Sequence, residues 1–154
     1  MSFNPIYSFF NTINLLIQGK MHFPKYKLGK TVKMEDGQIF TIFREVKIDT
    51  KSSSNKPVVF KVRFLLNGMS PKANMQFSWI PAPFIIGLPG FQAKLWMLNY
   101  KNNYFQGIYQ WESYEYAEKY SKSFAYRFMA GRSVPGTVSI EIIPNMSLEE
   151  YLGV

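Results

Sequence analysis

The sequence contains few side chains of the kinds that carry acid–base, nucleophilic or metal chemistry. Among its 154 residues there is no Cys, and His22 is the single histidine. Without Cys the chain has no thiolate nucleophile, no disulfide and no Cys-ligated metal. His22 has no second His or Cys with which to complete a metal site or a catalytic triad. We therefore expect no bound metal and no catalytic histidine.

The charged side chains of the second half do not single out a catalytic group either. Glu112 would be a candidate general base if it were buried. However, Glu112, Glu115 and Glu118 stand near an expected helix start, where negative charge suits the helix dipole. Arg127 and Arg132 could bind an anionic group of a substrate, although arginines are ordinarily solvated at the surface. The sequence therefore assigns no catalytic residue.

Aromatic side chains are the chemical feature in which the chain is rich. Residues 87–120, GLPGFQAKLWMLNYKNNYFQGIYQWESYEYAEKY, combine many Tyr, Phe and Trp residues with hardly any side chain suited to acid–base work. Each aromatic residue has two interpretations: part of the hydrophobic core, or wall of a pocket for a planar ligand. Only convergence around an enclosed volume would distinguish them.

The apolar periodicity of residues 57–145 predicts the elements that must position these aromatic residues. A strand of alternating apolar residues is followed by a helix that two prolines end, a hairpin with a polar tip, a longer helix and a last strand. The expected elements are strand 57–66, helix 70–80, strands 91–99 and 104–111, helix 113–131 and strand 138–142. This order is ferredoxin-like βαββαβ, in the α+β class.

The longer of these helices is expected to begin at Ser113, a good N-cap, and to end at Gly131. Four residues at helical spacing are expected to form its buried stripe: Ala117, Tyr120, Phe124 and Phe128.

An amphipathic helix is expected near the N-terminus. Asn4 is a suitable N-cap, Pro5 fits the first helical position, and Gly19 ends the apolar pattern. Its apolar residues are Ile6, Phe9, Phe10, Ile13, Leu16 and Ile17. Because this face must be hidden from water, we expect it to cover the main domain or a second subunit. Peripheral membrane contact through residues 4–30 is the alternative.

Residues 20–56 complete an expected N-terminal appendage. Five lysines between positions 20 and 33, with no acid among them, form either a solvated connector or a contact for anionic partners. Residues 31–48 favour a β-hairpin whose Asp36-Gly37 pair suits a type I′ turn. The polar residues 49–56 favour a linker. The expected organisation is an appendage at 1–56 and a ferredoxin-like domain at 57–154.

Composition indicates the setting in which the protein works. A net charge of +8 comes with 47% apolar and 18% charged residues, the balance of a globular domain with a real core. No apolar run is long enough to span a bilayer and the start does not follow the order of a secretory signal, so we expect a cytoplasmic protein. No nucleic-acid-binding motif is present, and we expect no nucleic-acid partner.

The segments FKVRFLLNG, GLPGFQAKLWM, QGIYQWES and AEKY resemble the YdhR-like mono-oxygenase family in order and approximate spacing, over residues 58–144. That family belongs to the dimeric α+β barrel superfamily. The resemblance implies a homodimer with a pocket between sheet and helices in each subunit. It also implies oxidation of phenolic molecules by O₂ without metal or flavin, and thus no cofactor. Haem chemistry with a histidine ligand is in doubt, because residues 57–154 contain no His.

A cofactor-free oxygenase needs an enclosed apolar pocket and a few polar groups that hold a phenolate. The expected function is a mono-oxygenase-like protein that binds or oxidises a small planar hydrophobic molecule. The alternative is a non-enzymatic ligand-binding or scaffold protein on the same fold. The resemblance places an Asn after the first strand, matched by Asn67. The candidate ligand-binding residues are Asn67, Phe77, Trp79, Phe84, Trp96, Tyr109, Trp111, Tyr120, Phe124 and Arg127.

Overall fold

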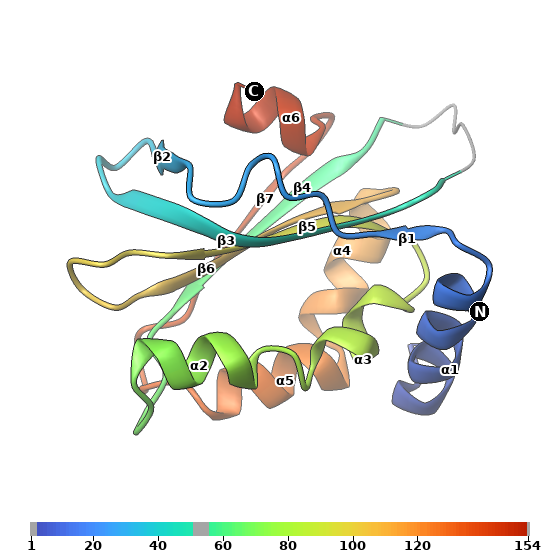
Figure 1. Cartoon of the computed structure of the whole chain (residues 1–154), viewed down its shortest axis with the longest axis horizontal. Coiled ribbons are helices and arrows are strands. Elements are labelled where there is room, and N and C mark those ends of the chain that lie inside the picture. Colours follow the sequence, from blue (N-terminus) through green and yellow to red (C-terminus); the bar gives the residue numbers. More distant parts are fainter. Residues whose placement is uncertain (1–2, 51–55, 154) are drawn as a thin grey trace.

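A computed structural model of the chain, which describes residues 3–50 and 56–153, shows one antiparallel sheet with helices below it and a short helix above it (Figure 1). The strands are β1 Met21–His22, β2 Thr31–Lys33, β3 Ile39–Ile48, β4 Val58–Phe64, β5 Phe91–Leu98, β6 Phe105–Trp111 and β7 Ser139–Ile143. The helices are α1 Pro5–Ile17, α2 Pro71–Phe77, α3 Ala82–Ile86, α4 Tyr114–Ser121, α5 Phe124–Gly131 and α6 Leu148–Leu152.

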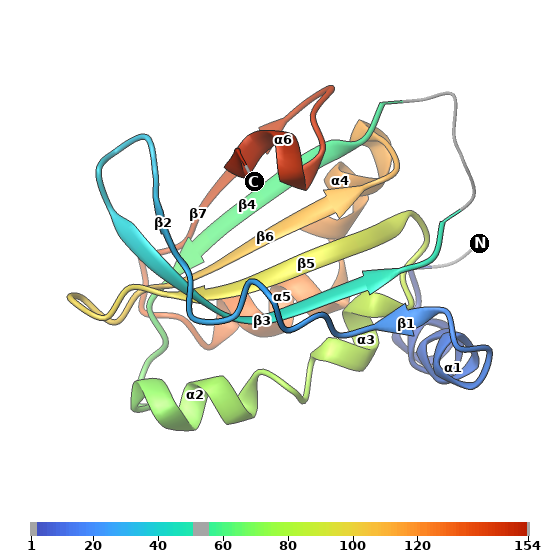
Figure 2. The same ribbon diagram turned by 45° about the horizontal axis from the view of Figure 1, so that its top comes forward.

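The strands lie side by side in the order β1-β3-β5-β6-β4-β7, and β2 pairs with β3 (Figure 2). The central strands β4, β5 and β6 come from the predicted ferredoxin-like region. The α+β ferredoxin-like fold expected from the sequence is therefore confirmed.

The N-terminal hairpin belongs to this same sheet and is not a separate appendage. β3 pairs with β5 in antiparallel register, with Arg44 opposite Trp96 and Val46 opposite Lys94. The expected boundary at residue 56, between an appendage and a ferredoxin-like domain, thus falls inside one sheet. Strand β3 pairs with the edge of β5 and satisfies its backbone hydrogen bonds. Most of the expected linker, residues 51–55, lies outside the described residues.

The turn of this hairpin differs from the expected type I′ geometry. The Gly37 amide donates to the Met34 carbonyl at 2.9 Å, and Gly37 has a φ of +84°. Asp36 is not among the described residues with positive φ. The connection is therefore a three-residue loop that ends in a left-handed glycine, for which only one residue must adopt positive φ.

The expected long helix 113–131 is two helices, α4 and α5. Ser123 forms a second N-cap by accepting a hydrogen bond from the Tyr126 amide, after α4 has ended at Ser121. This break changes the direction of the chain, so Ala117 and Tyr120 are buried as expected but Phe124 is 46% exposed. The alternation of β4 is confirmed: Val58, Phe60 and Val62 face the core below the sheet.

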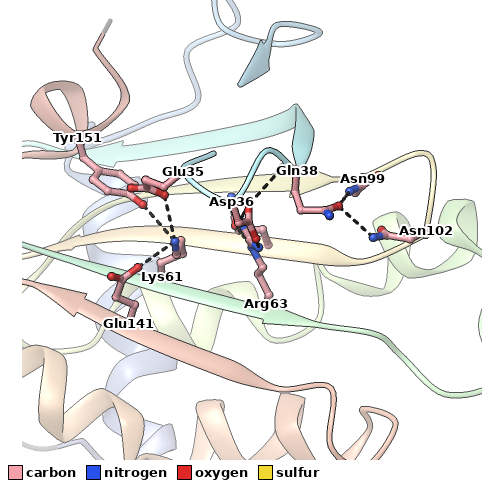
Figure 3. A network of polar contacts seen from close by, with 10 residues as sticks. Glu35, Asp36, Gln38, Lys61, Arg63, Asn99, Asn102, Glu141 and Tyr151 are labelled. Atoms are coloured by element: carbon pink, nitrogen blue, oxygen red, sulfur yellow. Dashed lines mark hydrogen bonds and ion pairs between the residues drawn. The ribbon is translucent and has the colours of Figure 1, made fainter. Parts of the chain in front are cut away.

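The upper face of the sheet is covered by the chain itself. Leu148 of α6 and Met34 are buried against a cluster that includes Leu95, Met97 and Ile108. A polar network crosses the same face and fastens the residue 35–38 turn and α6 to the sheet (Figure 3). In it, Lys61 lies 2.9 Å from Glu141, 3.6 Å from Glu35 and 3.2 Å from the hydroxyl of Tyr151. Arg63 pairs with Asp36, and Asn99 donates to Gln38 at 2.8 Å. The homodimer expected from the resemblance stays a prediction.

The N-terminal helix forms as expected, but its orientation is the reverse of the predicted one. The Asn4 side chain accepts hydrogen bonds from the amides of Ile6 and Tyr7, which caps the first turn. The residues that α1 buries are Ser8 and Thr12. Its apolar residues Ile6, Phe9, Phe10, Ile13, Leu16 and Ile17 are exposed. The prediction that this face covers the main domain is therefore wrong, because the side of α1 that packs closely against α3 is the one with Ser8 and Thr12.

Candidate functional site

A small cavity lies between the sheet and the helices beneath it. Its volume is about 50 Å³, and residues from β4, β5, β6, α2, α4 and α5 line it. The lining is mostly apolar and aromatic, and includes Phe77, Trp96, Phe105, Tyr109, Tyr120 and Phe128. Its polar side chains are Asn74, Ser78, Lys94, Gln106 and Arg132. An enclosed apolar space with few polar groups is the usual setting of a small-molecule site.

Lys94 is the one ammonium-bearing side chain that lines this cavity among the described residues. It is buried, with 6% of its surface exposed, because it stands on the inward face of the central strand β5, opposite Tyr109. Its amine lies 4.4 Å from the ring centres of both Trp96 and Tyr109. Within the described part of the chain, no hydrogen bond or ion pair joins this amine to an acceptor.

Burial sets the charge of the Lys94 amine. Loss of hydration lowers the pKa of Lys94 well below its usual value of 10.5, and the nearby positive charge of Arg44 lowers it further. The lowered pKa favours the neutral amine, whose free lone pair can accept a proton. When it does so, the resulting ammonium has a strong need for an anionic partner, because it is surrounded by aromatic rings rather than water.

Gly107 makes room for this arrangement. It pairs with Trp96 across the β5–β6 register, next to the Lys94–Tyr109 pair. A Cβ atom at position 107 would lie 2.9 Å from Cε1 of Tyr109 and 3.3 Å from Cε of Lys94. The absence of a side chain here allows the lysine stem and the phenol ring to lie over the same point of the sheet.

Two tyrosine hydroxyls form the second polar feature of the cavity. The Tyr109 and Tyr120 hydroxyls lie 2.8 Å apart, and both side chains are buried. Burial raises the pKa of Tyr109 and of Tyr120, so both remain neutral phenols at physiological pH. One phenol can donate its O–H to the other, and the second phenol can then donate its own O–H to a ligand.

Arg44 fastens α2 over the cavity. Its guanidinium donates to the Ser78 hydroxyl at 2.7 Å and to the Met75 carbonyl at 2.9 Å. It also lies 3.7 Å from the ring centre of Trp79. Loss of hydration lowers the pKa of Arg44 to about 10, which still leaves it charged at neutral pH. The arginine therefore holds the end of α2 and adds positive potential beside Lys94.

Asn74 of α2 contributes an unsatisfied polar group to the cavity wall. The side chain is 3% exposed, and its Nδ2 atom is buried without a hydrogen-bond acceptor in the described structure. A buried donor without an acceptor costs roughly 1–3 kcal/mol. An oxygen atom of a ligand in the cavity would remove that cost.

The structure brings together part of the set of candidate residues. Four of them line the cavity: Phe77, Trp96, Tyr109 and Tyr120. Trp96 and Tyr109 share the inward face. Trp111 is fully buried behind Tyr109 and Tyr120 as a core residue, with ring centres 6.2 and 5.1 Å away.

The other candidates lie elsewhere. Trp79 is half exposed and covers Arg44. Phe84 and Phe124 line a separate apolar hollow near α1. Asn67 and Arg127 are exposed, and neither lines the cavity. Asn67 follows β4 in a turn with Gly68, whose φ is +76°.

Sequence reasoning missed Lys94, Arg44 and Asn74. For Lys94 a signal was present: in FQAKLWML it stands two positions before Trp96 and therefore on the same face of the strand. Arg44 and Asn74 carry no such signal, because their roles depend on how β3 and α2 approach the cavity.

The donor groups of the described residues do not favour a metal or a His-ligated haem. No cluster of three or more His, Cys, Asp or Glu side chains that could hold a metal occurs in residues 3–50 and 56–153. His22 lies on β1 at the edge of the sheet, 3.0 Å from Asp49, and does not line the cavity.

The cavity is too small to hold a planar ring-shaped molecule. Its volume of about 50 Å³ is well below the roughly 150 Å³ that holds a benzene molecule in an engineered protein cavity. A ring-shaped ligand therefore requires the elements that line the cavity to move apart. If α2 were the element that moved, its contacts with Arg44 would break.

Three solved structures show the relationship of this fold to known proteins. One is an anthrone oxidase-like protein, with 15% identity and a TM-score of 0.51 over 71% of this chain and 55% of that chain. Another is a ferredoxin fold protein from Listeria monocytogenes related to antibiotic biosynthesis monooxygenases, with 12% identity and a TM-score of 0.53 over 84% and 94%. The third is a heme-degrading enzyme from Listeria monocytogenes, with 13% identity and a TM-score of 0.54 over 82% and 99%.

These similarities establish the fold. The chain has the α+β ferredoxin-like fold with an antiparallel sheet found in antibiotic biosynthesis monooxygenase-like proteins. No family model matches the sequence, and no curated protein matches it. Function must therefore be argued from the cavity.

Proposed function

We propose that the chain is a cofactor-independent mono-oxygenase-like protein that binds or oxidises a small planar hydrophobic molecule bearing a phenolic or enolic hydroxyl. The resemblance to the YdhR-like family and the fold shared with an anthrone oxidase-like protein support this proposal. The observation that carries it is Lys94, a buried amine held between Trp96 and Tyr109 with no acidic partner among the described residues.

The proposed role of Lys94 is that of a general base. The acidic O–H of the bound molecule donates its proton to the Lys94 amine, and the ring becomes a phenolate or enolate. The new ammonium and the anion stabilise each other strongly, because the surrounding rings exclude water. Arg44 adds positive potential, and the amide of Asn74 is a further hydrogen-bond donor in the wall of the same cavity.

The electron-rich ring of the phenolate is the group that reacts with O₂. In the net reaction of an anthrone-type carbon, a CH₂ group becomes C=O and O₂ supplies both the new oxygen atom and the oxygen of one water. The four electrons that O₂ accepts all come from that carbon. The proton held on Lys94 returns to the departing oxygen, so the amine ends the cycle neutral.

The alternative is a non-enzymatic protein that binds the same class of molecule. The small volume of the cavity favours it, since a ligand that is only stored need not leave room for O₂. The two proposals share the pocket and the Lys94 contact, and they differ in whether the bound molecule is consumed.

O₂ uptake distinguishes the two proposals. Wild-type protein is mixed with anthrone and a panel of naphthols, and oxygen consumption and product are measured. The expected result is one O₂ per product and a loss of kcat/KM of about 100-fold or more in Lys94→Met. Lys101→Met, which alters an exposed lysine at the tip of the β5–β6 hairpin, is the matched control and should behave as wild type.

Ligand binding by the same variants completes the test. Binding that Lys94→Met removes, without any O₂ uptake by the wild type, would favour the storage role. If the wild type neither binds nor oxidises any member of the panel, both proposals are wrong.

A further inference from the structure

The helix α1 is attached to the rest of the molecule through its polar side. Ser8 and Thr12 are buried, the Asn11 amide donates to the Gly87 carbonyl at 2.9 Å, and the Thr12 hydroxyl bonds to the Pro83 carbonyl. A Cβ atom on Gly87 would lie only 1.9 Å from the Ser8 carbonyl oxygen. This close contact between backbones fixes which side of the helix faces inward.

The opposite side of α1 presents an apolar stripe to solvent. Ile6, Phe10 and Ile17 are 66%, 63% and 78% exposed, and they lie on one line because they are spaced at four and seven residues. Phe9, Ile13 and Leu16 border this line and are also exposed. Leaving so many large apolar side chains in water is unfavourable, so the stripe is typical of an interaction surface.

The apolar surface continues beyond α1 along the layer of helices. Phe9 lies 5.5 Å from Phe84 of α3, between ring centres. Next to it is a hollow of about 210 Å³ that is lined by apolar residues, among them Pro5, Ile80, Phe84 and Phe124. Figure 1 shows α1, α3 and α5 on the same side of the sheet. The stripe and the hollow together form a surface that a bilayer could contact along one side of the molecule.

The charged side chains of residues 3–34 are all basic, and an acid that contacts this segment, Asp49, pairs with His22 at 3.0 Å. α1 carries no charged side chain, and the first acid in the sequence is Glu35. Lys20 and Lys25, which follow the helix, are exposed and have no ion pair with a described residue. A two-fold dimer through this surface would bring the lysines of the two copies near each other. Residues 3–34 supply no acid that could pair with them, which argues against a second copy as the occupant.

We propose that α1 and the lysines after it attach the protein to the surface of an anionic lipid bilayer. The stripe of Ile6, Phe10 and Ile17 enters the boundary between headgroups and acyl chains, with the helix lying in the membrane plane. Lys20 and Lys25 bind lipid phosphates at the edge of this contact. No helix among the described residues is long and apolar enough to cross a membrane, and attachment is peripheral.

Vesicle sedimentation tests this proposal. The full chain is mixed with vesicles of phosphatidylcholine, or of equal parts phosphatidylcholine and phosphatidylglycerol, at low and high salt. The expected result is binding to the anionic vesicles that high salt weakens. Phe10→Asp with Ile17→Asp should reduce partitioning by at least about tenfold. Tyr100→Asp, at an equally exposed site on the β5–β6 hairpin, is the control and should bind normally.

The lysine contribution is tested separately. Lys20→Glu with Lys25→Glu should weaken binding to the anionic vesicles, and Lys72→Glu with Lys101→Glu should weaken it less. All variants change exposed residues, and circular dichroism checks that each is folded. Absence of vesicle binding by the wild type overturns the proposal, as does binding that the Phe10 and Ile17 changes do not affect. A dimer in ultracentrifugation that Phe10→Asp dissociates, without vesicle binding, would identify a second copy as the occupant instead.

Discussion

Lys94 on β5 and Tyr109 on β6 are register partners in the sheet, and the lysine amine lies 4.4 Å from the centre of the tyrosine ring. Both side chains point to the helix-covered face. This pairing places a titratable amine inside an aromatic cavity, and it gives the protein a pH dependence that can be measured.

Lys94→Met is expected to stabilise the protein at neutral pH. In the folded state burial lowers the pKa of Lys94 well below 10.5, so the unfolded chain binds more protons between the two pKa values. The wild type therefore gains stability as pH rises towards 10.5. The variant lacks this dependence and should be more stable by about 1 kcal/mol or more at pH 7. Urea unfolding of both proteins from neutral to alkaline pH checks this, and a difference that does not shrink with pH would contradict it.

The Tyr109–Tyr120 hydrogen bond is expected to show strong coupling in a double-mutant cycle. Tyr109→Phe or Tyr120→Phe alone leaves one buried hydroxyl without its partner, which should cost about 1–3 kcal/mol. In the double variant no hydroxyl is left unpaired, so its loss should be smaller than the sum of the two single losses. Denaturant unfolding of the four proteins measures this, and simple additivity would mean that the two hydroxyls do not interact.

Gly107→Ala is expected to disturb the cavity. The new methyl group would press on Tyr109 and on the stem of Lys94, and overpacking of this kind costs about 1–3 kcal/mol. The control is Gly131→Ala in α5, where nothing lies within 4 Å of the added atom and φ is not positive. Thermal unfolding should show a lower Tm for the first variant and an equal or higher Tm for the second. Equal Tm values for both would show that the sheet absorbs the methyl group.

Arg44→Met is expected to loosen α2. The variant loses the hydrogen bonds to Ser78 and Met75 that hold the end of this helix to β3. Tryptic cleavage after the exposed Lys72 in α2 should become about tenfold faster, because local opening becomes easier when bonds to a charged group are lost. Cleavage after Lys101 in the β5–β6 hairpin is the internal control. A uniform rise at both sites would instead indicate global destabilisation.

Much of the architecture follows from local patterns in the sequence. The alternation of Val58, Phe60 and Val62 is enough to predict β4 and its buried face, and Asn4 with Pro5 marks the start of α1. These features are readable because strand periodicity and helix capping depend on residues close together in the chain. The aromatic lining of the cavity was partly predictable for the same reason, through Trp96 and Tyr109.

The remaining features depend on contacts between distant segments. Which side of α1 faces inward is decided by the backbone approach of Ser8 to Gly87, and amphipathicity alone predicts the opposite side. The membership of β3 in the sheet is decided by its pairing with β5. By itself the sequence determined the elements and their apolar faces, since these arise from local stereochemistry. Only the tertiary structure decided that Lys94 and Asn74 line one cavity and that Arg44 lies beside it, because their proximity depends on strand register and on helix packing.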